Sequence, residues 1–238
     1  MLEVDWQDQN SIWAAHPTNH RLVPGGSEYG RYLWVRDQIA PGSRVLDVGC
    51  NCGQLAVNLT RDLGCEVVGV DIVLDFIRHC KVHKKEWGAF YCLDFSRVSV
   101  RQLPACGLHY QSFDVVTALE VIEHAIDIRG FLERAVFVLK PGGRLIVTTP
   151  HPASPTYGYP YYRRHAHHVR VWTPWRLEQV FGPMAVYKEL VNDGEVTQMG
   201  VVFERLPHHA DVELRAGICP SRVVGRELYQ ISGSMGHR

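Results

Sequence analysis

Residues 44–54 read Arg-Val-Leu-Asp-Val-Gly-Cys-Asn-Cys-Gly-Gln, and this stretch decides the fold. Its first half is a β-branched apolar run typical of a strand, and its second half is a glycine turn that opens a helix. Gly49 and Gly53 tolerate a backbone with positive φ, and Asn51 is one of the few other residues that does. In open α/β sheets, ligands bind beyond the carboxyl ends of the strands. We therefore predict a ligand-binding loop here.

The segments on either side of this loop continue the same alternation. Short apolar runs predict strands, and the segments between them have the periodicity of amphipathic helices, which favours βαβ units in a parallel sheet. A further helix is expected upstream, before the first strand. The expected strands are 44–48, 66–70, 89–92, 113–119 and 144–148, and the expected helices are 27–39, 53–63, 73–86 and 128–139.

Beyond residue 150 the pattern changes. The stretch 151–170 is rich in proline, tyrosine and histidine, which makes it too irregular for a core element and too aromatic for a disordered linker. Residues 173–181 then indicate a short helix. Residues 184–191 and 196–204 flank an Asn-Asp-Gly turn and indicate a hairpin that gives the sheet an antiparallel edge strand.

Composition and charge narrow the class of protein. The 238 residues fit one elaborated domain, and the balance of 25 Lys plus Arg against 25 Asp plus Glu argues against a broad basic surface for nucleic acid or membranes. No apolar run approaches the ~20 residues that span a bilayer, and residues 1–10 lack the basic start of a secretion signal. The seven cysteines form no Cys-x-x-Cys pair, so we expect reduced thiols and a cytoplasmic protein.

Two carboxylates accompany the glycine loop. Asp71 ends the second expected strand, where a carboxylate can accept both hydroxyl groups of a ribose. The loop lacks the G-x-G-x-x-G pattern of dinucleotide sites, in which a helix N-terminus faces a pyrophosphate. Asp47 beside the loop would repel a pyrophosphate, but it suits a ligand that carries an amino group and a sulfonium.

These residues resemble the class I S-adenosylmethionine (AdoMet)-dependent methyltransferases, whose first motif is an apolar strand followed by D-x-G-x-G-x-G. The resemblance covers residues 44–150 and is closest to the type 11/12 and ubiquinone-pathway O-methyltransferases. It implies a Rossmann-like α/β fold with a seven-stranded sheet of order 3-2-1-4-5-7-6, the last strand antiparallel, and helices on both faces. The matching runs are Asp47 to Gly53, Val70-Asp71, Asp94-Phe95, Phe113 to Val116, Glu120 to His124 and Leu139 to Leu145.

The same resemblance assigns the residues that contact the cofactor. It implies that Asp47, Gly49 and Gly53 shape the methionyl pocket, that Asp71 holds the ribose, and that Asp94 with Phe95 contacts the adenine. Asn51 departs from the usual middle glycine of the motif. The remaining residues that we expect to contact AdoMet, or the product S-adenosylhomocysteine, are Cys50, Asn51, Cys52, Ile72, Glu120 and Val121.

The resemblance also suggests how the chain divides. We expect a single domain overall, in which residues 44–206 form the AdoMet-binding methyltransferase domain and include a substrate-side loop at 151–172. Residues 1–43 would be an N-terminal arm and helix that cover the active site, with Trp6, Trp13, His16 and His20 at its edge. Residues 207–238 would be a C-terminal extension.

The run Glu120 to His124 is expected on the side of the cofactor where the molecule that receives the methyl group would bind. If a helical turn begins at Glu120, the side chains of Glu120, Glu123 and His124 share one face. Three interpretations are open: His124 acts as a general base on an attacking hydroxyl, the three residues bind a metal, or Glu123 only orients His124 in a structural turn. Because methyl transfer otherwise needs mainly alignment, a base beside the methyl group favours O-methylation.

A second histidine, His168, lies in a run that resembles a segment of two groups of enzymes. One group is the ubiquinone-pathway O-methyltransferases with many sugar and natural-product methyltransferases, and the other is the small-RNA 2′-O-methyltransferases. In small-RNA 3′-terminal 2′-O-methyltransferases the matching histidine completes a metal site, so His168 would be a fourth ligand here, for Mg or Mn. The alternative is that His168 and Arg170 pin the loop to the sheet. The loop itself interleaves tyrosines with cations, which suits a lid over an aromatic ring. These residues are Tyr157, Tyr159, Tyr161, Tyr162, Arg163, Arg164 and His165.

We therefore predict a methyltransferase that O-methylates a small aromatic or sugar-containing molecule, with His124, Glu123 and His168 as catalytic residues. The alternatives are a metal-assisted RNA 2′-O-methyltransferase and a non-catalytic module that binds AdoMet. A divalent metal is an alternative that we do not favour. No membrane partner is expected, and neither the acceptor nor the oligomeric state follows from the sequence.

Overall fold

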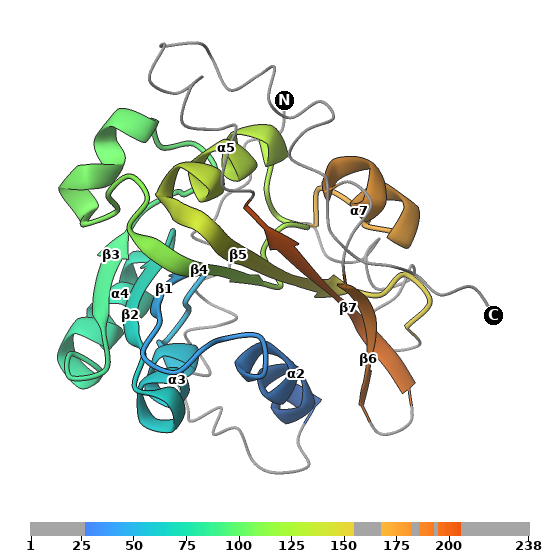
Figure 1. Cartoon of the computed structure of the whole chain (residues 1–238), viewed down its shortest axis with the longest axis horizontal. Coiled ribbons are helices and arrows are strands. Elements are labelled where there is room, and N and C mark those ends of the chain that lie inside the picture. Colours follow the sequence, from blue (N-terminus) through green and yellow to red (C-terminus); the bar gives the residue numbers. More distant parts are fainter. Residues whose placement is uncertain (1–26, 155–167, 182–185, 193–194, 206–238) are drawn as a thin grey trace.

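The computed structural model describes residues 27–154, 168–181, 186–192 and 195–205, and its centre is one seven-stranded sheet (Figure 1). The strand order is β3-β2-β1-β4-β5-β7-β6. Open α/β sheets bind their ligands beyond the carboxyl ends of the strands. The strands are β1 (Arg44–Val48), β2 (Glu66–Asp71), β3 (Ala89–Cys92), β4 (Phe113–Leu119), β5 (Leu139–Pro150), β6 (Val186–Asn192) and β7 (Glu195–Glu204).

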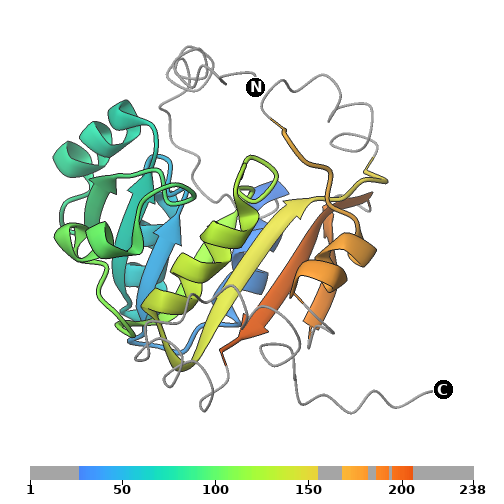
Figure 2. The same cartoon turned by 90° about the horizontal axis from the view of Figure 1, so that it is seen from above.

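Helices cover both faces of the sheet because successive strand side chains point to opposite sides. On β1, for example, Val45 joins the core under one face and Leu46 the core under the other. The first core packs against α2 (Ser27–Arg36), α3 (Gln54–Leu63) and α4 (Leu74–His83). The second packs against the 3-10 helix η1 (Val100–Cys106), α5 (Ile128–Val138) and α7 (Pro174–Phe181), so that the sheet lies between two layers of helices (Figures 1 and 2).

The parallel register brings the ends of four strands to one edge of the sheet. Val48 at the end of β1 pairs with Val70 and Ala118, and Leu119 at the end of β4 pairs with Thr148. The loops that follow β1, β2 and β4 therefore leave the sheet side by side. This edge is where the sequence places its candidate functional residues.

The expected α/β fold and its strand order, which already placed the seventh strand between the fifth and the sixth, are confirmed. The expectation that the hairpin gives an antiparallel edge strand is wrong. The antiparallel strand β7 is inside the sheet, between β5 and β6, and β6 occupies the edge. Strand β5 also begins earlier than expected, because Leu139 still pairs with Phe113 before an irregularity between Phe113 and Val115. The run Lys140-Pro141-Gly142-Gly143, which follows the helix expected at 128–139, therefore lies within this strand.

Several predictions concern residues outside the described part of the chain. These are the arm before Ser27, most of the tyrosine-rich loop, the Asp-Gly pair of the hairpin and the extension after residue 206. The described helices are 7 to 11 residues long, and none of them has the length and apolar character to cross a membrane. The division of the chain into arm, domain and extension stays a prediction.

Candidate active site

The glycine loop after β1 has the backbone that its residues predicted. Gly49, Asn51 and Gly53 all have positive φ, of 74°, 47° and 74°. The N–H of Gly49 donates to the carbonyl of Val70 at 2.8 Å, which ties the loop to the end of β2. A Cβ atom on Gly49 would lie 2.4 Å from Cγ2 of Val121, so the loop after β1 and the loop after β4 touch through this glycine.

Asp71 holds the glycine loop from the neighbouring strand. Its Oδ2 accepts the backbone N–H of Asn51 at 2.9 Å, and its Oδ1 accepts that of Val73 at 2.9 Å. The carboxyl group is buried, and burial raises its pKa even though the backbone donors oppose the shift. Ile72 beside it is partly exposed. The carboxylate thus organises the loop and still lies at the strand end where a ribose would bind.

Asp47 lies inside β1 and is 3% exposed. Its Oδ1 accepts the hydroxyl of Thr117 on β4 at 2.8 Å. Burial, and then the charge of Asp71, raise the pKa of Asp47 to about 7, against the opposing effects of Thr117 and Arg31. Near neutral pH this carboxyl therefore exchanges a proton readily, and a cationic ligand group beside it would favour its charged form.

Arg31 on α2 is a residue of this region that the sequence analysis missed. Its Nη1 lies 3.8 Å from Oε1 of Glu120, and its charge lowers the pKa values of both Asp47 and Glu123. The guanidinium therefore faces three carboxyl groups at the carboxyl edge of the sheet. The helix pattern predicted α2 but gave no sign of which side chain on it reaches the site, because that depends on how α2 packs.

The two cysteines of the loop are placed differently. Cys50 is buried, and both it and Cys80 of α4 lie with their sulfur atoms near the carbonyl oxygen of Asn51, at 3.7 and 3.4 Å. Cys52 is only half-buried, and desolvation raises its pKa to about 11. Neither thiol is activated by its surroundings, so both act here as small packing residues.

The residues after β3 form a tight turn. Oδ1 of Asp94 accepts the N–H and the hydroxyl of Ser96, at 3.0 and 2.7 Å. Phe95 is a core residue whose ring packs edge-on against Phe131 of α5, with centroids 5.4 Å apart. Its side chain is therefore occupied by the protein core, and its backbone is the part that stays at the strand end.

The turn after β4 differs from the expected helical turn. Glu120 has a φ of 57°, and the short turn that follows is closed by the N–H of His124 donating to Val121 at 3.0 Å. The carboxylate of Glu120 accepts the hydroxyl of Thr148 at 2.9 Å. The idea that Glu120, Glu123 and His124 share one helical face is therefore wrong, because the left-handed backbone at Glu120 turns its side chain toward β5 and Arg31.

Glu123, His124 and His168 do come together. One ligand atom from each lies within 4.8 Å of the others, and the two imidazole rings are edge-to-face with centroids 4.8 Å apart. Glu123 is 1% exposed and accepts the hydroxyl of Thr149 at 3.1 Å, and its Oε1 lies 4.0 Å from Nε2 of His124. Burial, and then the charge of Glu120, raise the pKa of Glu123 well above its usual range.

The segment around His168 is anchored to this turn by its backbone. The N–H of Val169 donates to the carbonyl of Glu123 at 3.0 Å, and Nη2 of Arg170 donates to the carbonyl of Ile126 at 3.3 Å. The side chain of His124 is 25% exposed, so it combines a fixed position with access to a ligand. A partly exposed imidazole beside a buried carboxyl is a common arrangement for moving a proton.

Comparison with known proteins finds a family model and relatives that match the sequence of this chain. Residues 46–147 match the family model described as a methyltransferase domain. The chain is 38% identical over 108 residues to a ubiquinone biosynthesis O-methyltransferase of Bradyrhizobium sp. (strain ORS 278), covering 45% of this chain and 40% of the relative. It is 33% identical over 167 residues to the mitochondrial ubiquinone biosynthesis O-methyltransferase of Homo sapiens, covering 62% and 41%. The chain thus spans about two fifths of the length of these relatives.

Solved structures share the fold at lower identity. The protein solved in complex with the Haloferax volcanii Trm112 methyltransferase activator matches with a TM-score of 0.68 and 16% identity, covering 85% of this chain and 97% of that one. A SAM-dependent methyltransferase from Aquifex aeolicus matches with a TM-score of 0.58 and 18% identity, covering 79% and 97%. At these identities the likeness concerns the fold.

Proposed function

We propose that this chain, whose residues 46–147 match a methyltransferase domain, is a class I methyltransferase with AdoMet as its cofactor, and that it transfers the methyl group to an oxygen of a small aromatic or sugar-containing molecule. The observation that carries the proposal is the position of His124. It lies at the carboxyl end of β4, in the loop whose Val121 touches the glycine loop, with its imidazole partly exposed. The curated relatives named as O-methyltransferases support an oxygen acceptor.

The cofactor would lie across the ends of β1 and β2. We assign the ribose to Asp71, the methionyl amino group to Asp47 and the methionyl carboxylate to Arg31, because each ligand group then meets a side chain of complementary charge. The glycine loop lets the backbone approach the ligand closely. Asp94 is assigned to the adenine, and its Oδ2 keeps an acceptor site since Ser96 uses only Oδ1.

For the chemical step, the sulfonium is already a good leaving group, so the protein mainly aligns the acceptor and removes its proton. We assign the base to His124. The carboxyl group of Glu123, whose Oε1 lies 4.0 Å from Nε2 of His124, would orient this imidazole. Because burial raises the pKa of Glu123, it would stabilise the imidazolium by charge only where the positive charge on His124 favours the ionised carboxylate. His168 packs edge-on against the His124 ring and limits its rotation.

A second candidate is a metal-assisted methyltransferase that acts on RNA 2′-hydroxyls. The observation that favours it is the cluster of one carboxylate and two imidazoles, a donor set that binds divalent cations. The structure weakens the four-ligand version of this idea, because Glu120 faces Thr148 and Arg31. Glu123, His124 and His168 would then hold the metal, which would polarise the acceptor hydroxyl.

One experiment separates these candidates. Labelled AdoMet is incubated with the protein and a panel of phenols, glycosides and RNA ends, with and without EDTA. We expect transfer to a small hydroxyl acceptor that EDTA does not change. Loss of transfer in EDTA with recovery in Mg or Mn would contradict the metal-free mechanism and favour RNA ends. A protein that binds S-adenosylhomocysteine but methylates nothing in the panel would favour the non-catalytic module.

A further inference from the structure

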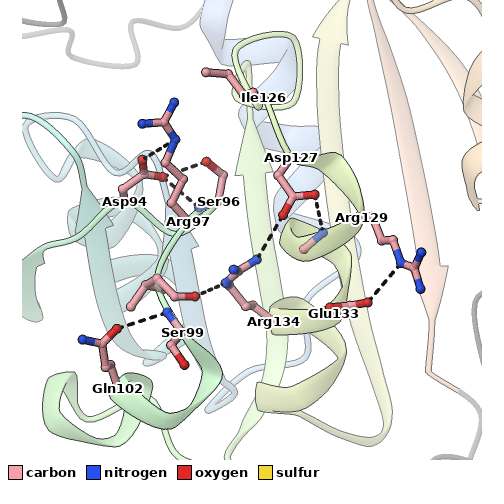
Figure 3. Close-up of polar contacts among 12 residues, drawn as sticks. Asp94, Ser96, Arg97, Ser99, Gln102, Ile126, Asp127, Arg129, Glu133 and Arg134 are labelled. Carbon is pink, nitrogen blue, oxygen red and sulfur yellow. Dashed lines mark hydrogen bonds and ion pairs between the residues drawn. The ribbon is translucent and has the colours of Figure 1, made fainter. Parts of the chain in front are cut away.

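Arg134 lies on the buried side of α5 and reaches away from the helix. Its Nε donates a hydrogen bond to the backbone carbonyl of Val98, and its Nη1 lies 4.0 Å from Oδ2 of Asp127 at the start of the same helix. Figure 3 shows the guanidinium between these two groups. With its side chain only 12% exposed, Arg134 connects α5 to the segment that follows β3.

That segment is a single tight turn that begins at Asp94. The backbone N–H groups of Arg97 and Val98 both donate to the carbonyl of Asp94, at 3.1 and 2.9 Å. Oδ1 of Asp94 receives the two donors of Ser96, while Oδ2 lies 3.7 Å from Nε of Arg97, which is longer than a hydrogen bond. Among the described residues, Oδ2 of Asp94 has Arg97 as an ion-pair partner on the exposed side of the turn, and Arg134 holds the far end of that turn.

Asp127 and Gly130 lie beside the Nη1 end of the Arg134 guanidinium. Oδ1 of Asp127 accepts the N–H of Gly130 at 2.9 Å and caps α5, which leaves Oδ2 for Arg134. A Cβ atom on residue 130 would lie 2.1 Å from Oδ2 of Asp127 and 2.3 Å from Nη1 of Arg134. The absence of a side chain at Gly130 is thus what gives the ion pair its space.

We propose that Arg134 is a positioning residue for adenine recognition: through Val98 it fixes the turn that aims the Asp94 carboxylate at the exocyclic amine of the cofactor. The inference rests on the proposed function, because it takes Asp94 as the adenine-binding residue. The adenine amine is a donor, and a carboxylate oxygen is its natural acceptor. Arg134 itself touches no ligand in this scheme.

The test compares two ligands on each variant, S-adenosylhomocysteine and S-inosylhomocysteine, in which an oxygen replaces the adenine amine. The ratio of their dissociation constants reports recognition of the amine, and it is independent of how much of the protein is folded. We expect the intact chain to prefer the adenosine ligand by about 10- to 100-fold, the range of a hydrogen bond to a charged group. Asp94→Ala should remove this preference.

Two variants then remove the positioning in different ways. Arg134→Gln deletes the charge, and Gly130→Ala displaces the ion pair while keeping both charged groups and favouring the helix. Both should lower the preference about tenfold, and Arg134→Lys should restore part of it. The matched control is Arg129→Gln, which deletes an exposed arginine of the same helix that pairs only with Glu133 among the described residues (Figure 3).

The outcomes are distinct. A preference that stays at the wild-type value in Arg134→Gln and Gly130→Ala, or that falls equally in Arg129→Gln, overturns the inference and leaves the proposed function standing. A wild-type chain that binds neither ligand overturns both. Loss of preference in the two variants with an unchanged Arg129→Gln supports the positioning role.

Discussion

The loops after β1 and β2 are held through their backbone N–H groups, whereas the turn after β4 has backbone hydrogen bonds and, in addition, side-chain contacts of its two glutamates with β5 and α2. On the cofactor side, Asp71 binds two backbone N–H groups and Gly49 donates to Val70. On the acceptor side, the hydroxyls of Thr148 and Thr149 hold Glu120 and Glu123. The comparison suggests that the first region depends on backbone shape, and that the second depends on individual side chains that can change without loss of the fold.

The largest effect is expected on the acceptor side. His124→Ala should lower methyl transfer about 10²–10⁴-fold, because it removes the proposed base, and it should leave AdoMet affinity unchanged because the cofactor side keeps its backbone. Turnover with a confirmed acceptor and calorimetry with AdoMet measure the two quantities. His109→Ala is the control, since this exposed histidine precedes β4 at the opposite edge of the sheet. Equal turnover in the two variants would contradict the role of His124.

The next effect concerns Asp71 on the cofactor side. Asp71→Ala removes the proposed ribose contact and the acceptor for the N–H groups of Asn51 and Val73, so AdoMet affinity should fall by about 1.5–3 kcal/mol for each charged hydrogen bond lost to the ligand. Calorimetry measures the change. Asp75→Ala removes an exposed carboxylate that pairs with Arg78, and it should bind AdoMet normally. Unchanged binding by Asp71→Ala would sink the ribose assignment.

A pair of glycine variants sharpens the backbone argument. Gly49→Ala and Gly42→Ala both place a side chain at φ near 75°, which costs about 1–2 kcal/mol of stability. Only Gly49→Ala also collides with Val121, because nothing lies within 4 Å of a Cβ atom on Gly42. Gly49→Ala should therefore lose more stability than Gly42→Ala, whose cost is backbone strain alone, and only Gly49→Ala should lose AdoMet affinity, about tenfold. Thermal unfolding measures the stability of the two variants, and calorimetry measures their affinity for AdoMet. Equal AdoMet affinity in the two variants would contradict the prediction.

Part of the fold and of the candidate site could be predicted from the sequence, and part could not. The strands β1, β3 and β4 were predicted at their observed bounds. In β1 and β4 this is because buried runs rich in β-branched residues favour a strand, whereas β3 is a short apolar and aromatic run between two helical segments. The positions of Asp47, Gly49 and Asp71 at strand ends, and the positive φ of Gly49, could be predicted because backbone geometry there follows local sequence. Arg31 was missed and Glu120 was misplaced, because the position of each depends on tertiary packing.

The smallest effect concerns the proton on Asp47. Its pKa is raised to about 7, so the folded apo chain binds more protons than the unfolded chain between about pH 4 and 7. This carboxyl therefore lowers stability as the pH rises through that window. The ammonium group of AdoMet should favour the charged form, so binding near pH 6 should release up to about one proton.

Calorimetry in buffers of different ionisation enthalpy measures this proton release. Asp47→Asn keeps the shape of the side chain but has no titrating proton, so its binding enthalpy should not vary with the buffer. A wild-type enthalpy that is equally insensitive to the buffer would show that Asp47 does not face the ammonium group.

The position of β7 has a consequence for biosynthesis. Because β7 lies between β5 and β6, strand β5 keeps an open edge until Glu204 has been synthesised, although β5 itself is complete at Pro150. At the usual speed of translation, about 5–20 residues per second, this interval lasts roughly 3 to 11 seconds. An uncovered strand edge presents unpaired backbone N–H and C=O groups, which can pair with a strand of another chain. The nascent chain therefore exposes the edge of β5 to such pairing until β7 has been made.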